Sequence, residues 1–564
     1  MTSHPPTPAV VAQSAVRRLP RVALWLFCLA YVLPGFIGRD PWRSQDLAAF
    51  GVMRALAKGD SAWWPVRWMG QGVELPALVP YWLGGLSIKL APAWVSPDFA
   101  ARIPFAMLLG ITLLATWYAV YYLARRDSSQ PVPFAFGGEA QPTDYARAMA
   151  DGGLLSMIAM LGLAQLSHET TPYAAQLAFT AVLFFAYAAS PYRTALSAIT
   201  ACIATFGLAL SGVPAFGLAL ACAGALAKAL QKDPYARYWA MYFAAVGVAA
   251  AGVAIKLDLW YAHMGHVPTA WVDWRSWGKL MLWFTWPAWP MALIGLWKWR
   301  AWWRHFHIAL PLSFASVIII ATIIAPNADR TLLLAAPPLA CLAAFALPTL
   351  QRNVTALIDW FTLLFFSGCG LIIWVVWIAM QTGVPAQPAA NVRRLLPGFE
   401  PTFTWLAFLA ALAATIAWGW LVVWRAGRHQ DALWKSLVLP AGGAAMSWLL
   451  LMTLWMPLLN FARSDVATVR QITRTIPAGD KSCVAISGLS QADATAITYH
   501  GNLRLVLLSG NTDCAWLITG AATQVDMSFS NSAGQWRKAG GARRRSSDRD
   551  DWVVYRRVAT PAVR

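Results

Sequence analysis

The sequence predicts a mainly helical protein that crosses a membrane many times and carries a small α/β domain at its C-terminal end. Three observations lead to this fold class. Of 564 residues, 58% are hydrophobic and only 12% are charged, a balance that soluble proteins do not show. Apolar segments of roughly 16 to 25 residues recur along the chain, which is the length of a membrane span. The last hundred or so residues, by contrast, are more polar and alternate between short helical and strand-like patterns.

Each apolar segment can cross about 30 Å of hydrocarbon as a helix that rises about 1.5 Å per residue. We expect about thirteen such spans, and the ambiguous segments 77–94 and 211–214 change this count by one or two. The first span is expected to remain as an uncleaved anchor. The expected spans are residues 22–38, 101–124, 151–167, 173–190, 194–211, 212–230, 237–256, 279–298, 307–325, 331–348, 355–381, 402–424 and 436–459.

The basic residues indicate the orientation of these spans. If Arg17, Arg18 and Arg21 lie inside, the other loops rich in Lys and Arg fall inside as well, as the positive-inside rule requires. We therefore expect a bacterial inner-membrane protein with its C-terminal tail in the periplasm. The first outer loop, residues 39–100, departs from the rule because it keeps several arginines. Two interpretations remain open: the loop binds an anionic lipid headgroup, or it is simply long and amphipathic.

The tail predicts a separate outer domain. We divide the chain into a transmembrane domain of residues 1–459, with its first periplasmic loop at 39–100, and a periplasmic α/β domain of residues 460–564. The tail patterns predict helices at 465–472 and 491–499 and strands at 483–486, 503–508, 515–519 and 552–555.

Seven cysteines separate into two groups. Five lie inside apolar spans, whereas Cys483 and Cys514 lie in the tail. Because a periplasmic tail lies in an oxidising space, these two can form a disulfide. The alternative, two buried free thiols at the starts of strands, is equally compatible with the sequence.

Several function classes are disfavoured by what the sequence lacks. It contains no phosphate-binding glycine loop, so nucleotide-driven transport has no support. The centres of the spans are nearly free of charged residues, which argues against an ion-coupled carrier. The net charge of +19 is explained mostly by the cytoplasmic loops and not by nucleic-acid binding. The polar residues gather at the outer ends of the spans. This placement favours a reaction at the outer membrane interface over a transport path through the bundle.

The first outer loop carries the most specific pattern in the chain. Asp40-Pro41-Trp42 is followed by Gln45-Asp46, Phe50-Gly51, Gly59-Asp60, Trp63-Trp64-Pro65 and Pro80-Tyr81-Trp82. This pattern resembles the first outer loop of polyprenyl-phosphate-dependent glycosyltransferases, in particular the lipid A aminoarabinose transferase and protein O-mannosyltransferase group. The match covers about residues 38–82 and is weaker around 327–330 and 337–339. The resemblance implies the C-type glycosyltransferase fold, which has about thirteen spans, a long first outer loop and, in the aminoarabinose type, a small outer domain.

Two departures from the family pattern concern residues with expected roles. The family carries an Asp-Glu pair where this chain has Gln45-Asp46, so the base role must pass to Asp46 or be lost. The family also has Glu-Lys-Pro-Pro where this chain reads Glu74-Leu75-Pro76-Ala77. The lysine that would contact a phosphate is thus Leu75, and another cation must replace it.

The expected chemistry assigns roles to acids and cations at the outer face. A transfer from a polyprenyl-phosphate sugar needs a carboxylate that takes the acceptor's proton or orients the acceptor. Asp46 is the predicted base, with Asp40 as a second catalytic carboxylate. The departing phosphate needs cationic hydrogen-bond donors. Their interaction with the phosphate is stronger at the membrane face, where the dielectric constant is low, than in water. Arg330 is the first choice, although it can also be an ordinary arginine at the end of a span. Further candidates are Arg43, Arg67 and Lys279.

Other polar and aromatic residues of the outer loops are expected to line the substrate cavity. They are Gln45, Glu74, Tyr81, Trp82, His168, Glu169, His263 and His266. Glu74 with a histidine from a distant loop can bind a divalent metal ion, but no ligand spacing requires one. His168 and Glu169 can instead form only a structural turn, and the nearby tryptophans can belong to an interfacial belt.

The functional prediction is a membrane glycosyltransferase, a hexosyl or pentosyl transferase. It moves one sugar from a polyprenyl-phosphate carrier to a lipid A-like lipid or a protein acceptor at the periplasmic face. Its expected partners are the donor, the acceptor and membrane lipids, without nucleic acid, and the expected state is a monomer. The alternative is a non-catalytic or degenerate relative that binds or carries polyprenyl phosphate, which the changes at Gln45 and Leu75 keep open. A lipid-linked polymer ligase matches only partly, around Asn391–Arg394.

Overall fold

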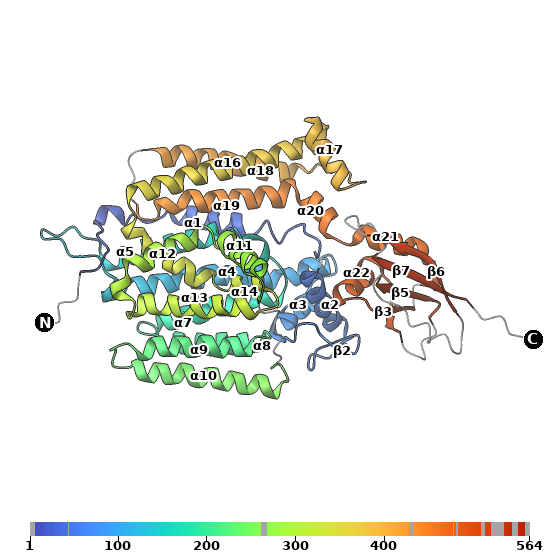
Figure 1. The fold of residues 1–564 in the computed structure, drawn as a ribbon, viewed down its shortest axis with the longest axis horizontal. Helices are drawn as coiled ribbons and strands as arrows, with labels where there is room; N and C mark the ends of the chain where they lie inside the picture. Colours follow the sequence, from blue (N-terminus) through green and yellow to red (C-terminus); the bar gives the residue numbers. More distant parts are fainter. Residues whose placement is uncertain are drawn as a thin grey trace, which may run out of the picture.

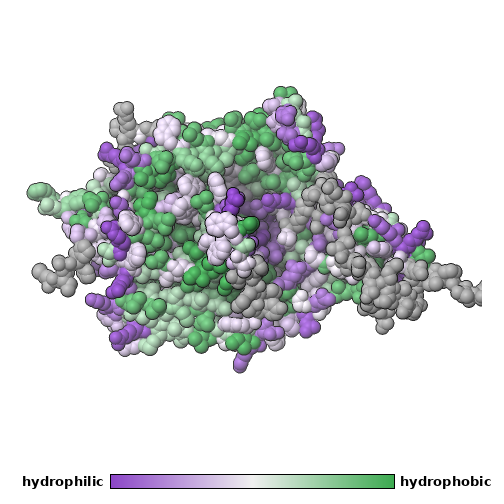
Figure 2. All heavy atoms as spheres, viewed as in Figure 1, coloured by the Kyte–Doolittle hydropathy of each residue, from purple (hydrophilic) through white to green (hydrophobic). Residues whose placement is uncertain are grey.

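The helices lie side by side in one bundle, and a small sheet lies beyond one end of it (Figure 1). The computed structural model describes residues 6–42, 44–260, 268–427, 432–477, 479–480, 483–508, 514–520, 535–543 and 551–558. Hydrophobic residues cover the middle of the bundle, whereas hydrophilic residues collect towards its ends (Figure 2). This distribution is that of a protein whose bundle lies in a membrane.

The long helices of the bundle follow the apolar segments of the sequence. They are α1 (Arg21–Val32), α4 (Pro97–Ala124), α5 (Pro142–Ala159), α7 (Pro172–Ala189), α8 (Thr194–Leu210), α9 (Pro214–Ala229), α10 (Ala236–Lys256), α11 (Trp271–Phe284), α12 (Ala288–Lys298), α13 (Phe306–Ile324), α15 (Ala336–Ala346), α16 (Arg352–Thr382), α18 (Trp405–Ala426) and α19 (Lys435–Leu454). Short helices connect them, namely α6 (Leu163–Leu166), α14 (Ala328–Leu333), α17 (Ala386–Leu395) and α20 (Met456–Arg463).

Not every expected span is a full-length membrane helix. Within the described residues, seven helices are long and apolar enough to cross a membrane, or eight if one bent pair forms a single span. The segments around α1, α8, α9 and α15 form shorter apolar helices. The chain is therefore polytopic and mainly helical, as predicted.

Two expected spans differ from the helices that form. The expected span 151–167 only partly overlaps α5. This helix begins earlier than expected, at Pro142, and ends at Ala159. Proline is favoured in the first turn of a helix, which explains why α5 begins at Pro142. The first turn is polar, so a search for apolar segments did not detect it. The segment 279–298 contains the end of α11 and all of α12, which meet at an angle of 87° around Pro287. Proline cannot continue the helical hydrogen bonding, so the span breaks there.

The first outer loop folds into helices at one end of the bundle. It contains α2 (Gln45–Lys58), the short antiparallel strands β1 (Arg67–Trp68) and β2 (Gln71–Gly72), and α3 (Val79–Leu90). Gly59 ends α2 in the left-handed conformation, with φ of 82°, which glycine adopts without steric cost. The residues of α2 from Asp46 to Met53 are buried, so this helix is a packed part of the structure and not a surface arm.

The C-terminal region forms a five-stranded mixed sheet with two helices. The strands are β3 (Val484–Ser487), β4 (Leu505–Leu507), β5 (Trp516–Gly520), β6 (Gln535–Ala542) and β7 (Trp552–Val558), in the order β4-β3-β5-β7-β6. Strand β3 runs parallel to β4 and β5, whereas β7 pairs antiparallel with β5 and β6. Helices α21 (Val466–Thr475) and α22 (Gln491–Gly501) complete the small α/β layer. Strand β6 was not predicted, because its sequence is polar and contains two glycines.

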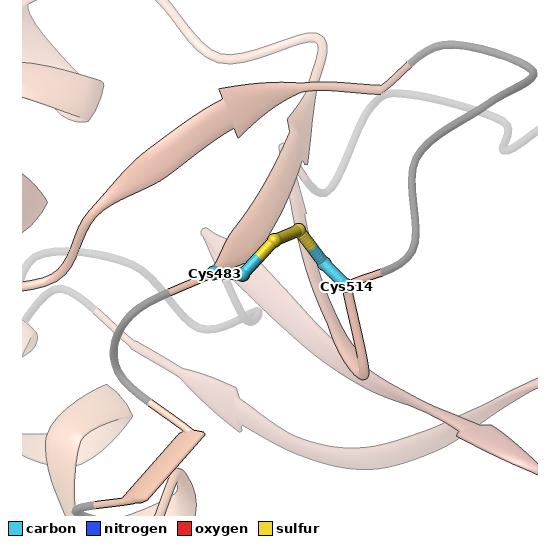
Figure 3. The surroundings of a disulfide bond; sticks show 2 residues. All are labelled: Cys483 and Cys514. Atoms are coloured by element: carbon cyan, nitrogen blue, oxygen red, sulfur yellow. A yellow bond between two sulfur atoms is a disulfide. The ribbon is translucent and has the colours of Figure 1, made fainter.

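Cys483 and Cys514 form a disulfide beside strands β3 and β5 (Figure 3). The bond joins the residue before β3 to a residue just before β5, two parallel neighbours in the sheet. It closes a loop across a sequence separation of 31 residues. The other five cysteines are free thiols.

The sheet region is attached to the first outer loop through α22. The backbone N–H of Glu74 donates to Oε1 of Gln491, and the N–H of Gln491 donates back to Oε1 of Glu74, both at 3.1 Å. Nε2 of Gln491 also donates to the carbonyl oxygen of Ala48 in α2. The boundary placed at residue 460 falls inside α20, so the division into two domains stays a prediction.

Close packing between α2 and α22 gives a testable expectation. A Cβ atom at Gly51 would lie 2.0 Å from Oγ1 of Thr495, whereas a Cβ at Gly110 in α4 would meet nothing within 4 Å. We expect Gly51→Ala to lower the melting temperature and to speed protease cleavage between α20 and α21. Gly110→Ala, the matched control, should leave both unchanged or slightly improved, since alanine favours helices. Equal behaviour of the two variants would contradict the tight docking.

The disulfide can be tested by thiol labelling. A crosslink that closes a loop of this length stabilises a domain by about 4 kcal/mol in the chain-entropy model. We expect the purified protein to resist labelling at Cys483 and Cys514 until a reductant is added, as measured by peptide mass spectrometry. Cys483→Ser should lower the melting temperature of the sheet region. Full labelling of both thiols in the unreduced, denatured protein would show that the bond is absent.

Candidate functional site

Asp46 lies in the first turn of α2, at the centre of a buried hydrogen-bond network. Its Oδ2 accepts a hydrogen bond from Nη2 of Arg39 at 2.9 Å and from the N–H of Trp42 at 3.2 Å. Its Oδ1 accepts from the backbone N–H of Thr170 at 2.8 Å and from the hydroxyl of Thr170. The first turn of a helix favours a negative charge, because its N–H groups have no helical partners. The carboxylate is only 2% exposed and has donors on both oxygens.

Two buried arginines surround this carboxylate. The Arg39 side chain has no exposed surface, and its guanidinium lies 4.9 Å from the ring centre of Trp42. Its Nε and Nη1 atoms are buried without a hydrogen-bond partner among the described residues. Arg102, in the second turn of α4, is also buried and forms an ion pair with Asp98 at 3.2 Å. The site therefore holds more buried donors than its carboxylates use.

These surroundings keep Asp46 ionised. Burial opposes its charge, but the charges of Arg39 and Arg102 and the hydrogen bonds from Thr170 outweigh burial and lower the pKa of Asp46. A carboxylate with a lowered pKa and fully occupied oxygens is a weak proton acceptor. In this network Asp46 is therefore better placed to hold Arg39, Trp42 and Thr170 in position than to accept a proton.

A second acid and a second arginine form an ion pair beside this network. Glu169, in the turn before α7, accepts from Nη2 of Arg330 at 3.0 Å on Oε2 and from Nε at 3.3 Å on the same oxygen. Nη2 also reaches Oε1 at 3.3 Å. Arg330 lies on α14, and its guanidinium is 5.9 Å from the ring centre of Tyr173. The side chains of Arg330 and Glu169 are 15% and 9% exposed, so this pair is less sealed than Arg39 and Asp46.

Asp46 and Arg330 thus meet through two consecutive residues, Glu169 and Thr170. Burial raises the pKa of Glu169; the Arg330 charge opposes this rise and the Asp46 charge adds to it. Burial disfavours the charge on Arg330, but the Glu169 carboxylate outweighs burial and raises the pKa of Arg330. The two carboxylates of the site therefore have opposite pKa shifts, which is a pattern of acid–base sites. Figure 2 shows a recess with hydrophilic residues beside the place where Figure 1 draws α11, on the side that faces the sheet.

Asn460 of α20 holds the Asp40-Pro41-Trp42 segment in place. Its Oδ1 accepts from the N–H of Asp40 at 3.1 Å and from Nε1 of Trp42 at 3.0 Å. Its Nδ2 donates to the carbonyl oxygen of Gly38 at 3.0 Å. Asp40 lies in this half-buried segment, and the three hydrogen bonds of Asn460 explain why the segment adopts one conformation although it is a loop.

Three residues predicted to line the substrate cavity lie in packed positions. His168 is fully buried against Phe36 and Trp448, and burial lowers its pKa to about 4. Tyr81 is buried and donates its hydroxyl to the carbonyl oxygen of Leu75. Trp82 donates Nε1 to the carbonyl oxygen of Trp63 at 2.8 Å. These contacts fix the outer loop, and a role in substrate binding stays a prediction for all three.

An outer cavity of about 640 Å³ contains two other predicted residues. Arg67 and Glu74 line it together with residues 257–259, which follow α10. Glu74 uses its carboxylate on Gln491, as described above. The described residues contain no group of three or more potential metal ligands. His263 and His266, the other candidates for a metal site with Glu74, lie outside the described residues, so this site stays a prediction.

Among the remaining predicted residues, Gln45 and Lys279 form no side-chain hydrogen bond or ion pair with the network around Asp46 in the described part of the chain. Gln45 is half-buried at the start of α2, and its role as a cavity residue is untested. Lys279 is exposed on α11, a helix that contacts α14. Arg43 lies outside the described residues.

The structure adds four residues that the sequence did not single out as site residues, namely Arg39, Arg102, Thr170 and Asn460. Arg39 directly precedes the Asp-Pro-Trp motif, which was a usable signal. Arg102 was read as part of the start of an apolar span. Thr170 and Asn460 come from segments far away in the sequence, and only the fold brings them to Asp46 and Trp42.

The buried ion pair predicts how acid and substitution change stability. Because the pKa of Asp46 is lower in the folded protein, its contribution is complete above the ordinary carboxyl pKa of about 4 and is lost as the pH falls further. Asp46→Asn leaves Arg39 buried without a counter-charge, which costs about 3 kcal/mol or more. We expect a lower melting temperature at neutral pH and a weaker loss on acidification. Asp60→Asn, at an exposed aspartate of the same loop, should behave like the wild type.

No family model matches the sequence, and no curated protein matches it. Two solved structures do match the whole fold. They are the crystal structures of ArnT from Cupriavidus metallidurans in the apo state and bound to undecaprenyl phosphate. Each aligns with a TM-score of 0.60 and 14% sequence identity, and covers 96% of this chain and 97% of the other.

The similarity extends over the bundle, the first outer loop and the C-terminal sheet, because nearly the entire length of both chains is aligned. The predicted fold class and the predicted structural relationship are thereby confirmed. At 14% identity the likeness concerns the fold and does not transfer individual residues. This chain has the fold of ArnT from Cupriavidus metallidurans.

Proposed function

We propose that this protein transfers a single sugar from a polyprenyl-phosphate carrier to a lipid or protein hydroxyl at the periplasmic face of the bacterial inner membrane. The observation that carries the proposal is the junction of Asp46, Thr170, Glu169 and Arg330 in the ArnT-like fold. This junction brings acids and cations together near the end of the bundle next to the sheet, and we propose that the phosphate and the sugar of the donor bind there. Support for the donor class comes from the similar ArnT structure that binds undecaprenyl phosphate.

In the proposed reaction, the acceptor oxygen attacks the anomeric carbon of the donor sugar. The bond between that carbon and the phosphate oxygen breaks, and the polyprenyl phosphate leaves with the electron pair. The acceptor proton passes to a carboxylate of the protein and then to water. The configuration at the anomeric carbon is inverted, and no further reactant is needed.

The sequence predicted Asp46 as the base, and the surroundings of Glu169 make it the stronger candidate. Glu169 has a raised pKa, which increases its affinity for a proton, whereas the pKa of Asp46 is lowered. Asp46 then acts as a fixed negative charge that orients Arg39 and the turn containing Thr170. This assignment makes Glu169 the proton acceptor in place of Asp46. Glu169 directly precedes Thr170, whose N–H donates a hydrogen bond to Asp46.

Arg330 couples donor binding to this base. In the structure its guanidinium pairs with Glu169. A donor phosphate that takes Arg330 away from Glu169 removes the cation that lowers the pKa of Glu169. The carboxylate then becomes a better base once the donor is bound. The same guanidinium stabilises the charge that develops on the departing phosphate, which is a main source of catalysis in such reactions.

The alternative function is a membrane protein that binds or carries polyprenyl phosphate without transferring sugar. The observation in its favour is that Asp46 is sealed from solvent and fully hydrogen-bonded. Under this alternative the arginines hold the lipid phosphate and Glu169 serves only as a counter-ion. Binding of polyprenyl phosphate without sugar transfer to envelope lipids or proteins would establish it.

Substitution of the two carboxylates separates their roles. We expect Glu169→Gln to reduce kcat by at least about a hundredfold, the usual contribution of a general base, while the Kd for polyprenyl phosphate changes little or tightens. Asp46→Asn should instead weaken donor binding and lower the melting temperature, because it disturbs the network. The measurements are sugar transfer from a polyprenyl-phosphate donor, lipid binding and thermal unfolding of the purified protein.

Two comparisons make this experiment decisive. Asp329→Asn, at the half-exposed neighbour of Arg330, removes a nearby charge without touching Glu169 and should retain most of the activity. In the wild type, kcat/KM should fall at low pH as Glu169 becomes protonated, and this fall should be absent from the residual activity of Glu169→Gln. A normal turnover of Glu169→Gln together with a dead but stable Asp46→Asn would return the base role to Asp46.

A further inference from the structure

A second cluster of charge lies at the other end of the bundle from Asp46. It is a surface cavity of about 460 Å³, here called the arginine pocket, lined by Arg21, Trp117, Tyr118, Tyr121, Tyr122, Arg125, Arg147, Tyr192 and Arg193. The four arginines come from four different segments: the first residue of α1, the end of α4, the first half of α5 and the residue before α8. None of the lining residues is acidic.

Few direct ion pairs neutralise the arginines of the pocket. Arg147 lies 3.9 Å from Asp144, a distance at the limit of an ion pair. For Arg21, Arg125 and Arg193, the part of the chain that the structure describes shows no ion pair with a carboxylate. The positive-inside rule explains why arginines occur at this end of the bundle. It does not explain why four of them line one cavity.

Aromatic rings form the floor of the pocket. Trp117 and Tyr121 stack with ring centres 5.6 Å apart, and Tyr122 stacks on Tyr192 at 5.3 Å. The guanidinium of Arg125 lies 5.2 Å from the ring centre of Tyr192. Below the floor, Nε1 of Trp117 donates to buried Asp151 at 2.9 Å, which fixes the indole. Tyrosine and tryptophan prefer the level of the lipid headgroups, where one end of the ring meets water and the other meets hydrocarbon.

Apolar side chains continue from the pocket along the membrane-facing surface. On α4, large hydrophobic residues are exposed one helical turn after another, away from Arg125, at Tyr118, Leu114, Ile111 and Met107. On α8, the exposed residues Leu196, Ile199 and Ile203 continue away from Arg193 in the same way. An occupant of the arginine pocket therefore has an anionic head and apolar chains that can lie on these rows. A free inorganic anion would use only the first of these features.

We propose that the arginine pocket binds the headgroup of an anionic phospholipid from the membrane leaflet opposite to the candidate active site. The guanidinium groups bind the phosphate oxygens by charge-assisted hydrogen bonds, and the acyl chains lie along α4 and α8. The site is separate from the sugar-transfer site, since Arg21 begins α1 and the chain reaches Arg39 only after α1 has ended. The proposal does not depend on the proposed function.

Native mass spectrometry of the full-length protein in a neutral detergent tests this site. The probes are dioctanoyl phosphatidylglycerol, which is anionic, and dioctanoyl phosphatidylcholine, which is zwitterionic. We expect the wild type to prefer phosphatidylglycerol. Each arginine near a lipid surface contributes about fivefold to binding, so Arg21→Gln combined with Arg193→Gln should weaken this Kd about 30-fold.

The matched control combines Arg237→Gln with Arg352→Gln. These two exposed arginines lie in the first turns of α10 and α16, which the alternation of the spans puts at the same end, but they do not line the pocket. The control should bind phosphatidylglycerol like the wild type. Arg193→Lys keeps the charge but loses the planar fork, and an intermediate Kd from it supports the proposal if the double variant does not fold.

Three outcomes would overturn the proposal. The first is equal affinity of the wild type for the two lipids, and the second is an equal loss of binding in the two double variants. The third is displacement of bound phosphatidylglycerol by inorganic phosphate at the same concentration, which would identify a site for a free anion instead of a lipid.

Discussion

The buried ion pair between Arg39 and Asp46 is the interaction on which the outer end of this protein depends. A charge removed from water is tolerated only when partners surround it, and the resulting network joins three separate parts of the chain. Arg39 follows the first span, Asp46 begins α2, and Thr170 comes from the turn before α7. Because one carboxylate binds all three segments, the position of the outer loop relative to the bundle is determined by electrostatics as much as by packing.

The same network gives the two acids of the site different properties. Asp46 is held in its charged form by two arginines, whereas Glu169 lies next to that negative charge and has a raised pKa. Neither acid would behave this way in an isolated loop, since water would screen the charges. Arg330 pairs with Glu169 in turn, so the charges of Asp46, Glu169 and Arg330 influence one another.

The C-terminal sheet region belongs to this arrangement and is not a passive attachment. Asn460 holds the backbone at Asp40 across 420 residues, and Gln491 exchanges two hydrogen bonds with Glu74 across 417. Tyr499 packs on Phe50 of α2 and donates its hydroxyl to Asp98 at 3.0 Å. The helix that carries Asp46 is therefore supported from the membrane side by α4 and from the outer side by α22. This double support fixes the position of α2, although this helix belongs to the connection between α1 and α4.

The sequence by itself determined the properties that follow from local composition. Hydrophobic length predicted the helices, and the Asp-Pro-Trp segment indicated the loop that contains the buried network of Asp46. The orientation that the arginines indicate stays a prediction. Hydropathy could not reveal the start of α5 or the break at Pro287, because polar first turns and prolines lower the signal. Only the tertiary structure decided that Asp46 is sealed, that Glu169 pairs with Arg330, and that Arg39 and Arg102 are buried. The reason is physical: a side chain's pKa and partners depend on the charges and the burial around it, and these come from residues distant in the sequence.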